Sequence, residues 1–181
     1  GLGSIAQKAV LPAFKNATHN SRLVALVSGD KKKLEEVGRE YEVEARYTYD
    51  DYDECLRNPD VQAVYIATPH SNHGEYVRAA LEAGKPVLCE KPLVTTRAEG
   101  QALIELARSR GVFLMEALWT RFLPAYELAG RMLREGAIGE LRAMQSSFCF
   151  AASYDPLHRQ WNPALAGGSS IATMKRYSSA V

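Results

Sequence analysis

The chain has 181 residues, of which 46% are hydrophobic and 24% charged, and its formal net charge at pH 7 is +1. This composition is typical of a globular domain, and interspersed acids and bases exclude the electrostatic footprint of a nucleic-acid or membrane-surface protein. No apolar run is long enough to span a bilayer, and no leader segment opens the sequence. We therefore expect a cytoplasmic protein whose partner is a small molecule.

The cysteines give no sign of a metal site or a disulfide framework. Cys55, Cys89 and Cys149 are odd in number and widely spaced in the sequence. This pattern fits neither paired cystines nor a zinc site, and it is ordinary for a protein of a reducing compartment. We therefore predict no bound metal.

The chain opens on Gly1-Leu2-Gly3-Ser4-Ile5-Ala6, which has the G-x-G-x-x-A spacing of a dinucleotide-binding turn. The first glycine permits a tight turn, the second lets a pyrophosphate approach the backbone, and the small third residue allows close helix packing. Residues 5–14 read as the helix whose first amides would face the phosphates. We predict that Gly1, Gly3, Ser4 and Ile5 bind the cofactor; the alternative is a flexible terminus.

Short apolar runs alternate with helical segments along the next hundred residues. The runs lie at residues 23–27, 63–67, 87–89 and 112–117, and the helices at residues 31–41, 50–56, 71–83 and 96–110. Apolar runs without polar alternation are typical of parallel strands covered on both faces. The order predicts an α/β fold, a doubly wound parallel Rossmann-type sheet. Because the glycine-rich turn should follow a strand, we expect the sheet to lack its first strand and the sequence to be a fragment.

The segment after residues 23–27 bears on the choice of cofactor. It reads Ser28-Gly29-Asp30, followed by Lys31-Lys32-Lys33. An NAD site would usually place an acidic residue on the ribose diol, whereas small residues and lysines suit a 2'-phosphate. We predict that Ser28, Gly29 and Lys32 contact NADP, with NAD as the second choice. It remains open whether the lysines only begin a solvated helix and whether Asp30 serves a ribose.

Two further segments follow predicted strands, where the carboxyl ends of parallel strands line a ligand crevice. Thr68-Pro69-His70 is predicted to contact the nicotinamide ribose, although a surface or capping role suits His70 and His73 equally well. In Glu90-Lys91-Pro92, the lysine stands at a strand end on a backbone stiffened by proline. Lys91 would exchange a proton with a hydroxyl as hydride moves, and Glu90 would orient it or anchor the loop. The alternative is an ordinary solvated lysine.

Three of these stretches carry a resemblance to a known family: residues 1–6, 67–73 and 83–92. They resemble the oxidoreductase family of glucose-fructose oxidoreductase, inositol dehydrogenase and MocA. Residues 116–122 and 161–168 are most similar to its dimeric dihydrodiol dehydrogenase and D-xylose dehydrogenase branch. The resemblance runs from Gly1 to about Gly168.

The resemblance implies an NAD(P)-dependent dehydrogenase acting on the CH–OH group of a sugar, polyol or diol, with Lys91 as the proton-transfer residue. It also implies a Rossmann-type cofactor domain at residues 1–118 and the start of an α+β substrate and dimerisation domain at residues 119–181. Trp119 and Arg121 would line the cofactor and substrate cleft, unless they serve only packing and surface charge. The full-length protein is expected to be a homo-oligomer.

The sequence departs from the family pattern after Gly168. There the family continues into a helix that bears an aspartate and then a histidine or tyrosine. In this chain the aspartate position is Ala172, and Tyr177 fits only with a shift of one residue. We expect residues 169–181 to be an aberrant tail and the chain as given to be inactive. The alternative function is that of a non-catalytic dinucleotide-binding regulator.

Overall fold

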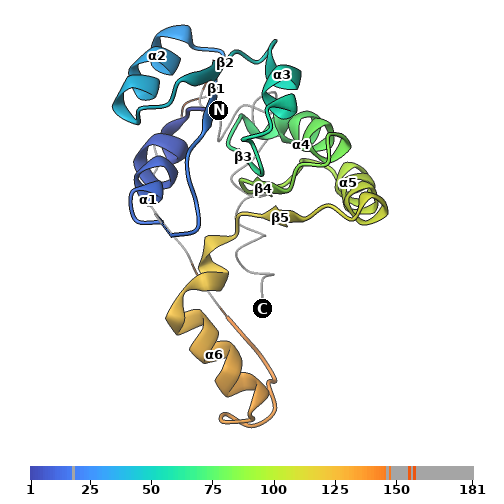
Figure 1. The fold of residues 1–181 in the computed structure, drawn as a ribbon. Coiled ribbons are helices and arrows are strands. Elements are labelled where there is room, and N and C mark those ends of the chain that lie inside the picture. Colours follow the sequence, from blue (N-terminus) through green and yellow to red (C-terminus); the bar gives the residue numbers. More distant parts are fainter. Residues whose placement is uncertain (18, 146, 148–154, 156, 158–181) are drawn as a thin grey trace. The chain divides into compact units, whose positions relative to one another are not determined.

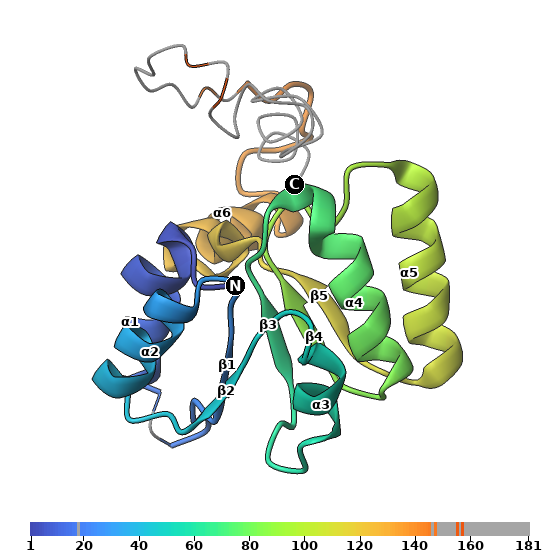
Figure 2. The same cartoon turned by 90° about the horizontal axis from the view of Figure 1, so that it is seen from above.

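The computed structural model describes residues 1–17, 19–145, 147, 155 and 157. The chain divides into two compact units, Gly1–Glu116 and Ala117–Val181. The first unit alternates strands and helices, and the described part of the second is mainly helical (Figures 1 and 2). The predicted aberrant tail at residues 169–181 lies outside the described residues.

The strands of the first unit form two parallel sheets. One contains β1 (Ala25–Val27) and β2 (Ala45–Tyr47), and the other contains β3 (Val64–Ile66), β4 (Val87–Cys89) and β5 (Leu114–Glu116) in that order. All pairings are parallel, and they place Ile66 beside Cys89 and Cys89 beside Glu116. The predicted parallel α/β fold is thereby confirmed, with its carboxyl strand ends at one edge of each sheet.

Helical segments connect the strands. They are η1 (Ala6–Val10), α1 (Leu11–Phe14), α2 (Lys31–Glu40), α3 (Tyr52–Arg57), η2 (His70–Asn72), α4 (His73–Glu82) and α5 (Arg97–Arg110). At the start of α5 the Thr96 hydroxyl accepts a hydrogen bond from the Glu99 amide at 3.3 Å. After its end Gly111 adopts a φ of 63°. The Thr96 cap and the left-handed Gly111 therefore mark the two ends of this helix, which the sequence pattern predicts at residues 96–110.

Two hydrophobic clusters stabilise the first unit. The larger one packs α4 and α5 on the second sheet, and its fully buried members include Val77, Leu81, Val87 and Leu103. The smaller one joins the first helix and α2 to β1; it consists of Leu2, Leu11, Leu26, Leu34, Val37 and Val43. Ala25, Val27 and Tyr47 of the first sheet also pack against the larger cluster, so this core is shared by both sheets.

Two elements differ from what the sequence pattern predicts. The pattern does not predict β2, because Arg46 interrupts its apolar character; the guanidinium instead pairs with the Glu35 carboxylate at 2.8 Å. Residues 141–151 read as a strand, but the described residues 141–145 lie in no strand. A strand requires a hydrogen-bonded neighbour, and none is described beside them. Most of the remaining residues of this stretch lie outside the described part of the chain.

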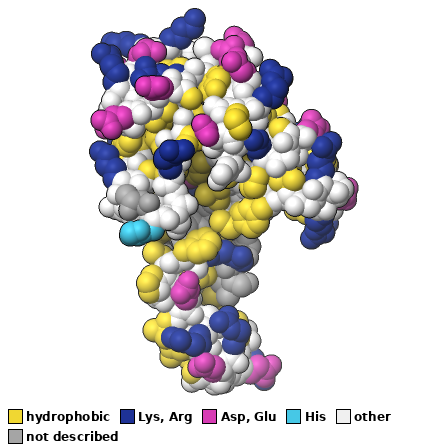
Figure 3. Space-filling view, in the orientation of Figure 1, with side chains coloured by type: hydrophobic (Ala, Val, Ile, Leu, Met, Phe, Trp, Pro, Cys, Tyr) yellow, Lys and Arg dark blue, Asp and Glu magenta, His cyan; other side chains and the backbone are white. Residues whose placement is uncertain are grey.

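The second unit begins with η3 (Trp119–Phe122) and α6 (Pro124–Arg134). Hydrophobic side chains of α6, such as Leu128 and Met132, are exposed, and Figure 3 shows hydrophobic and charged side chains next to one another on this helix. Among the described helices, none combines the length and the apolar character needed to cross a membrane.

Candidate functional site

The first residues of the chain lie against the loop that follows β3. A Cβ atom on Gly1 would lie 2.8 Å from the carbonyl oxygen of Ala67 and 3.1 Å from the amide nitrogen of Thr68. Both neighbours are backbone atoms that cannot move aside, so only glycine fits at this position. Gly3 has more space, because its Cβ would lie 3.9 Å from the Ala67 oxygen. The backbone of the opening turn therefore approaches the carboxyl end of β3 closely.

A helical stretch starts directly after this turn. Ser4 and Ile5 are exposed, whereas Ala6 is buried. The Gln7 amide donates a hydrogen bond to the Gly3 carbonyl at 3.1 Å, which closes the first helical turn. Amides at the start of a helix have no partner within the helix and are available to an anion. The turn thus has the exposed start and the small buried third residue that the G-x-G-x-x-A spacing predicts.

The loop after β1 is fixed by Ser28. Ser28 is buried; its amide donates to the Tyr47 carbonyl at 3.1 Å, and its hydroxyl accepts from the Asp30 amide at 3.2 Å. Gly29 lies against Tyr49, whose ring carbons would be 3.1 Å from an added Cβ. Ser28 and Gly29 therefore shape a tight loop at the carboxyl end of β1.

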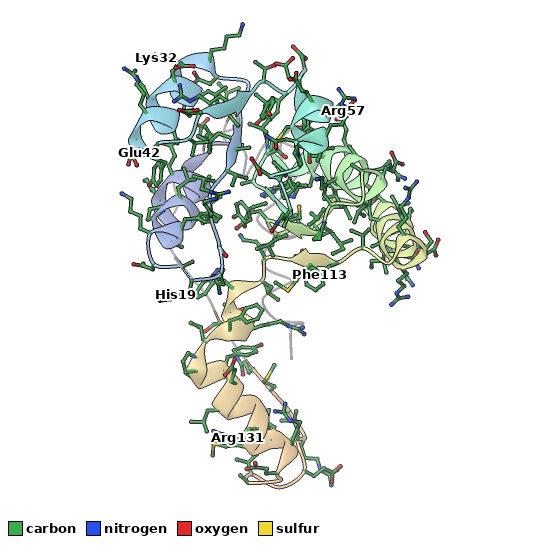
Figure 4. All side chains as sticks on the ribbon, viewed as in Figure 1. His19, Lys32, Glu42, Arg57, Phe113 and Arg131 are labelled. Atoms are coloured by element: carbon green, nitrogen blue, oxygen red, sulfur yellow. The ribbon has the colours of Figure 1, made fainter. Side chains whose placement is uncertain are left out.

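The charged residues that follow are engaged with the helix α2. The Asp30 carboxylate accepts a hydrogen bond from the Lys33 amide at 3.0 Å, and this bond lowers the pKa of Asp30. Asp30 is therefore the N-cap of α2 in this structure. Lys32 extends away from the helix (Figure 4), and its ammonium lies 3.9 Å from the Glu36 carboxylate. An exposed pair of this kind contributes little to stability, so Lys32 can turn toward a ligand at small cost.

Thr68 carries an unsatisfied polar atom. Its hydroxyl oxygen Oγ1 is buried but has no hydrogen-bond partner within the described part of the chain. Leaving a buried hydroxyl without a partner costs roughly 1–3 kcal/mol, so a ligand group that bonds to it would be favoured. Next to it, Pro69 is exposed and His70 is half-buried.

His73 connects the loop after β3 to the loop after β4. Its side chain is fully buried, with Nδ1 2.7 Å from the Pro92 carbonyl oxygen and Nε2 3.0 Å from the Thr68 carbonyl oxygen. Carbonyl oxygens only accept, so both hydrogen bonds form together when both ring nitrogens carry a proton. The sequence left a surface or capping role open for His73. The structure corrects this, because the position lies between two loops in the interior.

Glu90 fixes the backbone that carries Lys91. Its Oε1 accepts a hydrogen bond from the Tyr65 hydroxyl at 2.6 Å, and its Oε2 accepts from the Lys91 amide at 3.3 Å. Burial and the hydrogen bond to Glu90 raise the pKa of Tyr65. The Lys91–Pro92 peptide bond is cis. Lys91 itself is half-buried.

A second carboxylate holds the same loop from the other side. The Leu93 amide donates to Oε1 of Glu116 at 2.7 Å, and Glu116 ends the neighbouring strand β5. The Glu90 amide also donates to the Ile66 carbonyl at 2.8 Å, which ties β4 to the end of β3. The loop that bears Lys91 is therefore attached to the strands on both sides of β4.

The structure brings only part of the predicted site together. Gly1, Thr68, Glu90 and Lys91 lie on connected backbone at the ends of β3 and β4. Ser28, Gly29 and Lys32 lie at the corresponding end of β1 in the other sheet. Trp119 and Arg121 belong to the second unit, where both are exposed.

Three residues support the site in ways the sequence analysis does not assign: Tyr65, and His73 and Glu116, which lie within the stretches 67–73 and 116–122 that carry the family resemblance. Tyr65 and Glu116 do give a signal, because each is a polar residue inside an otherwise apolar strand, and a buried polar group requires a partner. No cluster of three potential metal ligands occurs among the described residues.

Comparison with known proteins shows what this chain is similar to. A family model described as "Oxidoreductase family, NAD-binding Rossmann fold" matches residues 1–118. Trans-1,2-dihydrobenzene-1,2-diol dehydrogenase from Mus musculus is 39% identical over 158 residues, which cover 87% of this chain and 46% of that protein. D-xylose 1-dehydrogenase (NADP(+)) from Hypocrea jecorina is 36% identical over 171 residues, which cover 88% of this chain and 44% of the relative.

A solved structure is similar as well. The crystal structure of aldose-aldose oxidoreductase from Caulobacter crescentus complexed with glycerol matches with a TM-score of 0.84 at 36% identity, covering 95% of this chain and 51% of that one. The chain thus spans about half the length of the relatives it matches. Since the family match covers residues 1–118, including the glycine turn and the Glu-Lys-Pro loop, the chain belongs to the oxidoreductase family of glucose-fructose oxidoreductase, inositol dehydrogenase and MocA.

Proposed function

We propose that this chain forms the cofactor-binding part of an NADP-dependent dehydrogenase that interconverts a CH–OH group and a carbonyl on a sugar, polyol or diol. The observation that carries the proposal is the attachment of the Lys91 loop to β3 and β5 through Glu90 and Glu116. The substrate class is supported by the names of the diol and D-xylose dehydrogenases to which the chain is similar.

The residues of this chain fit a dinucleotide. Gly1 leaves no room for a side chain beside Thr68, and the hydroxyl of Thr68 lacks a partner. We infer that the turn at Gly1, Gly3, Ser4 and Ile5 holds the pyrophosphate and that Thr68 contacts the nicotinamide ribose. Bound NADP would supply the hydride acceptor or donor.

Further contacts are assigned to both ends of the cofactor. We infer that Ser28 and Gly29 receive the adenosine ribose, and that Lys32 offsets the charge of its 2'-phosphate. At the nicotinamide end the inferred contacts are Pro69, His70, Glu90, Lys91, Trp119 and Arg121. NAD remains the second choice, since Lys32 can turn away from the ribose.

Lys91 is inferred to exchange a proton with the substrate oxygen. During oxidation its amine would take the proton from the hydroxyl, and during reduction its ammonium would return it. A backbone held by Glu90 and Glu116 limits the positions that the amine can reach, which favours a single reactive geometry.

The remaining inferences concern the whole protein. We propose that residues 119–181 begin a substrate and dimerisation domain and that the full-length protein is a homo-oligomer. A reducing cytoplasm would suit Cys55 and Cys89, which are free and buried. Light scattering on the natural full-length protein tests the oligomer, and a monomeric mass would contradict it.

Calorimetric titration of this chain tests the cofactor assignment. We expect NADPH to bind more tightly than NADH. The variant Lys32→Ala should bind NADPH about tenfold more weakly, the loss of one charge contact worth about 1.4 kcal/mol, with NADH affinity unchanged. Lys8→Ala, which removes an exposed lysine from the first helix, is the matched control.

The possible failures of this titration are distinct. If NADPH and NADH bind equally well, the assignment of Lys32 to a 2'-phosphate is wrong. If neither binds, the cofactor proposal is wrong for this chain.

A further inference from the structure

The middle residue of β3 is a tyrosine in an otherwise apolar strand. The other two residues of this strand belong to the larger hydrophobic cluster or pack against it, and Tyr65 pairs in register with Leu88 of β4. The Tyr65 side chain is half-buried and lines the same pocket as Gly1 and Thr68. A hydroxyl in such surroundings requires a hydrogen-bond partner, and the loop after β4 supplies one.

The partner is the carboxylate of Glu90. The Tyr65 hydroxyl donates to Oε1 of Glu90 at 2.6 Å, a length typical of a bond to a charged oxygen, and such bonds are roughly twice as strong as bonds between neutral groups. Burial and the hydrogen bond to Glu90 raise the pKa of Tyr65, so its hydroxyl keeps the proton and is the donor. Oε2 accepts a longer bond from the Lys91 amide at 3.3 Å. Tyr65 therefore makes the stronger of these two contacts with the carboxylate.

Other titratable groups surround the same loop. Burial raises the pKa of the Cys89 thiol, and the carboxylates of Glu116 and Glu90 raise it further, so the thiol stays neutral. From β5, Glu116 accepts a hydrogen bond from the loop backbone, and from α4 the ring of His73 lies beside a carbonyl oxygen of the loop. These two contacts hold the loop backbone, whereas Tyr65 holds the Glu90 carboxylate.

We propose that Tyr65 is a positioning residue for the proton transfer assigned to Lys91, an inference that rests on the proposed function. By donating to Oε1, Tyr65 keeps the Glu90 carboxylate against the backbone of the Lys91 loop and limits its approach to the Lys91 amine. In this role Tyr65 acts through Glu90 and contacts neither substrate nor cofactor.

The electrostatic effect of this contact has a definite sign. A carboxylate that loses the Tyr65 bond can turn toward another donor, and the ammonium of Lys91 belongs to the next residue in the chain. A negative charge beside an ammonium favours the protonated form. Oxidation requires Lys91 as the neutral amine, whereas reduction requires it as the ammonium. Loss of the Tyr65 contact should therefore slow oxidation at low pH and affect reduction less.

The test is Tyr65→Phe in the natural full-length protein, a change that keeps the ring and removes only the hydroxyl. Oxidation of diols or aldoses with NADP is measured from neutral to alkaline pH. The pH of half-maximal oxidation is expected to rise by about one unit, the lower end of the effect of a neighbouring opposite charge, so that oxidation falls by about tenfold below this pH and recovers above it. The KM for NADP should stay unchanged.

Two further variants are the controls. The Tyr52 hydroxyl donates to the Tyr76 carbonyl at 3.2 Å rather than to the Lys91 loop, so Tyr52→Phe should leave the pH profile unchanged. Glu90→Gln removes the charge on which the effect depends. In that background Tyr65→Phe should therefore shift the profile no further, as expected for two residues that act through one contact.

The outcomes separate this inference from the proposed function. Oxidation that survives Lys91→Ala would contradict the proposed function and the role of Tyr65 with it. Oxidation that depends on Lys91 but keeps its pH profile in Tyr65→Phe, or that slows equally at every pH, would overturn the role of Tyr65 alone. A shift of the same size in the Glu90→Gln background would also overturn it, because the effect would not pass through Glu90.

Discussion

Lys91 carries its amine on a backbone that neighbouring side chains hold in place. Replacing it with alanine removes the group that we propose as proton carrier but keeps the contacts of Glu90 and Glu116 with the loop backbone. We expect kcat of the natural full-length protein, assayed with diols or aldoses and NADP, to fall by about 10²–10⁴-fold, the usual contribution of general acid–base catalysis. NADPH affinity should change far less.

The control for this prediction is Lys8→Ala, which removes a lysine of the first helix and should leave kcat unchanged. Turnover retained in Lys91→Ala would show that another group carries the proton. A large loss of NADPH affinity with little change in kcat would instead assign Lys91 to binding alone.

The amino group of Gly1 makes stability depend on pH in a defined direction. Burial lowers its pKa from 8.0 to about 6 in the folded chain, so the unfolded chain binds the proton more tightly. Between these pH values the free energy of unfolding should therefore rise with pH, by roughly 2 kcal/mol over the window, and this contribution is lost as pH falls.

Urea unfolding of the chain that begins at Gly1, measured at about pH 5.5 and pH 8.5, tests this dependence. Nα-acetylation removes the ionisable amine and is the control, because the acetylated chain should lose this part of the slope. A slope that survives acetylation unchanged would assign it to other groups.

At the scale of elements, the buried His73 ring lies within hydrogen-bond distance of carbonyl oxygens in the loops after both β3 and β4. His73→Leu would remove the ring N–H that at least one of these two oxygens, of Thr68 or Pro92, accepts. We expect the free energy of unfolding to fall by about 1–3 kcal/mol, the usual cost of an unsatisfied buried acceptor. His70→Leu, at a half-buried neighbouring position, should cost under about 1 kcal/mol. Equal losses for the two variants in urea unfolding would contradict the bridging role.

The same elements show what a sequence can reveal. The helix α5 is predictable because its signals are local: Thr96 caps its start, and Gly111 takes the left-handed conformation after its end. The strand β2 is not predictable, because Arg46 interrupts its apolar pattern and instead forms an ion pair with Glu35, which is distant in sequence. Local chemistry fixes element boundaries, whereas pairing at a sheet edge depends on neighbours distant in sequence.

The candidate site likewise has a part that the sequence predicts and a part that it does not. The glycine turn and the Glu90-Lys91-Pro92 loop are recognisable, because their function requires particular residues at particular spacings. The contacts of Tyr65, His73 and Glu116 are not predictable in this way, since each joins the residue to a loop that lies 19 to 25 residues away in sequence. Only the fold brings these groups within hydrogen-bond distance.

At the scale of the whole first unit, stability depends on two hydrophobic clusters, and strands of both sheets pack against the larger one. A partly open pocket of about 150 Å³, lined by residues of β1 and β3, lies between the two sheets. The residues of both sheets that pack against the larger cluster therefore hold the unit together on one side of this pocket.

The division of the predicted cofactor contacts between the two sheets has a thermodynamic consequence. Ser28 follows β1, whereas Thr68 follows β3, so one NADP molecule bound to both would act as a non-covalent crosslink between the two sheets. Ligand at a hundredfold excess over its Kd should raise the free energy of unfolding by about 2.7 kcal/mol. Urea titrations with NADPH would measure the gain. Adenosine alone, which we expect to contact only the β1 side, should stabilise the sheet of β1 and β2 without linking it to the sheet of β3.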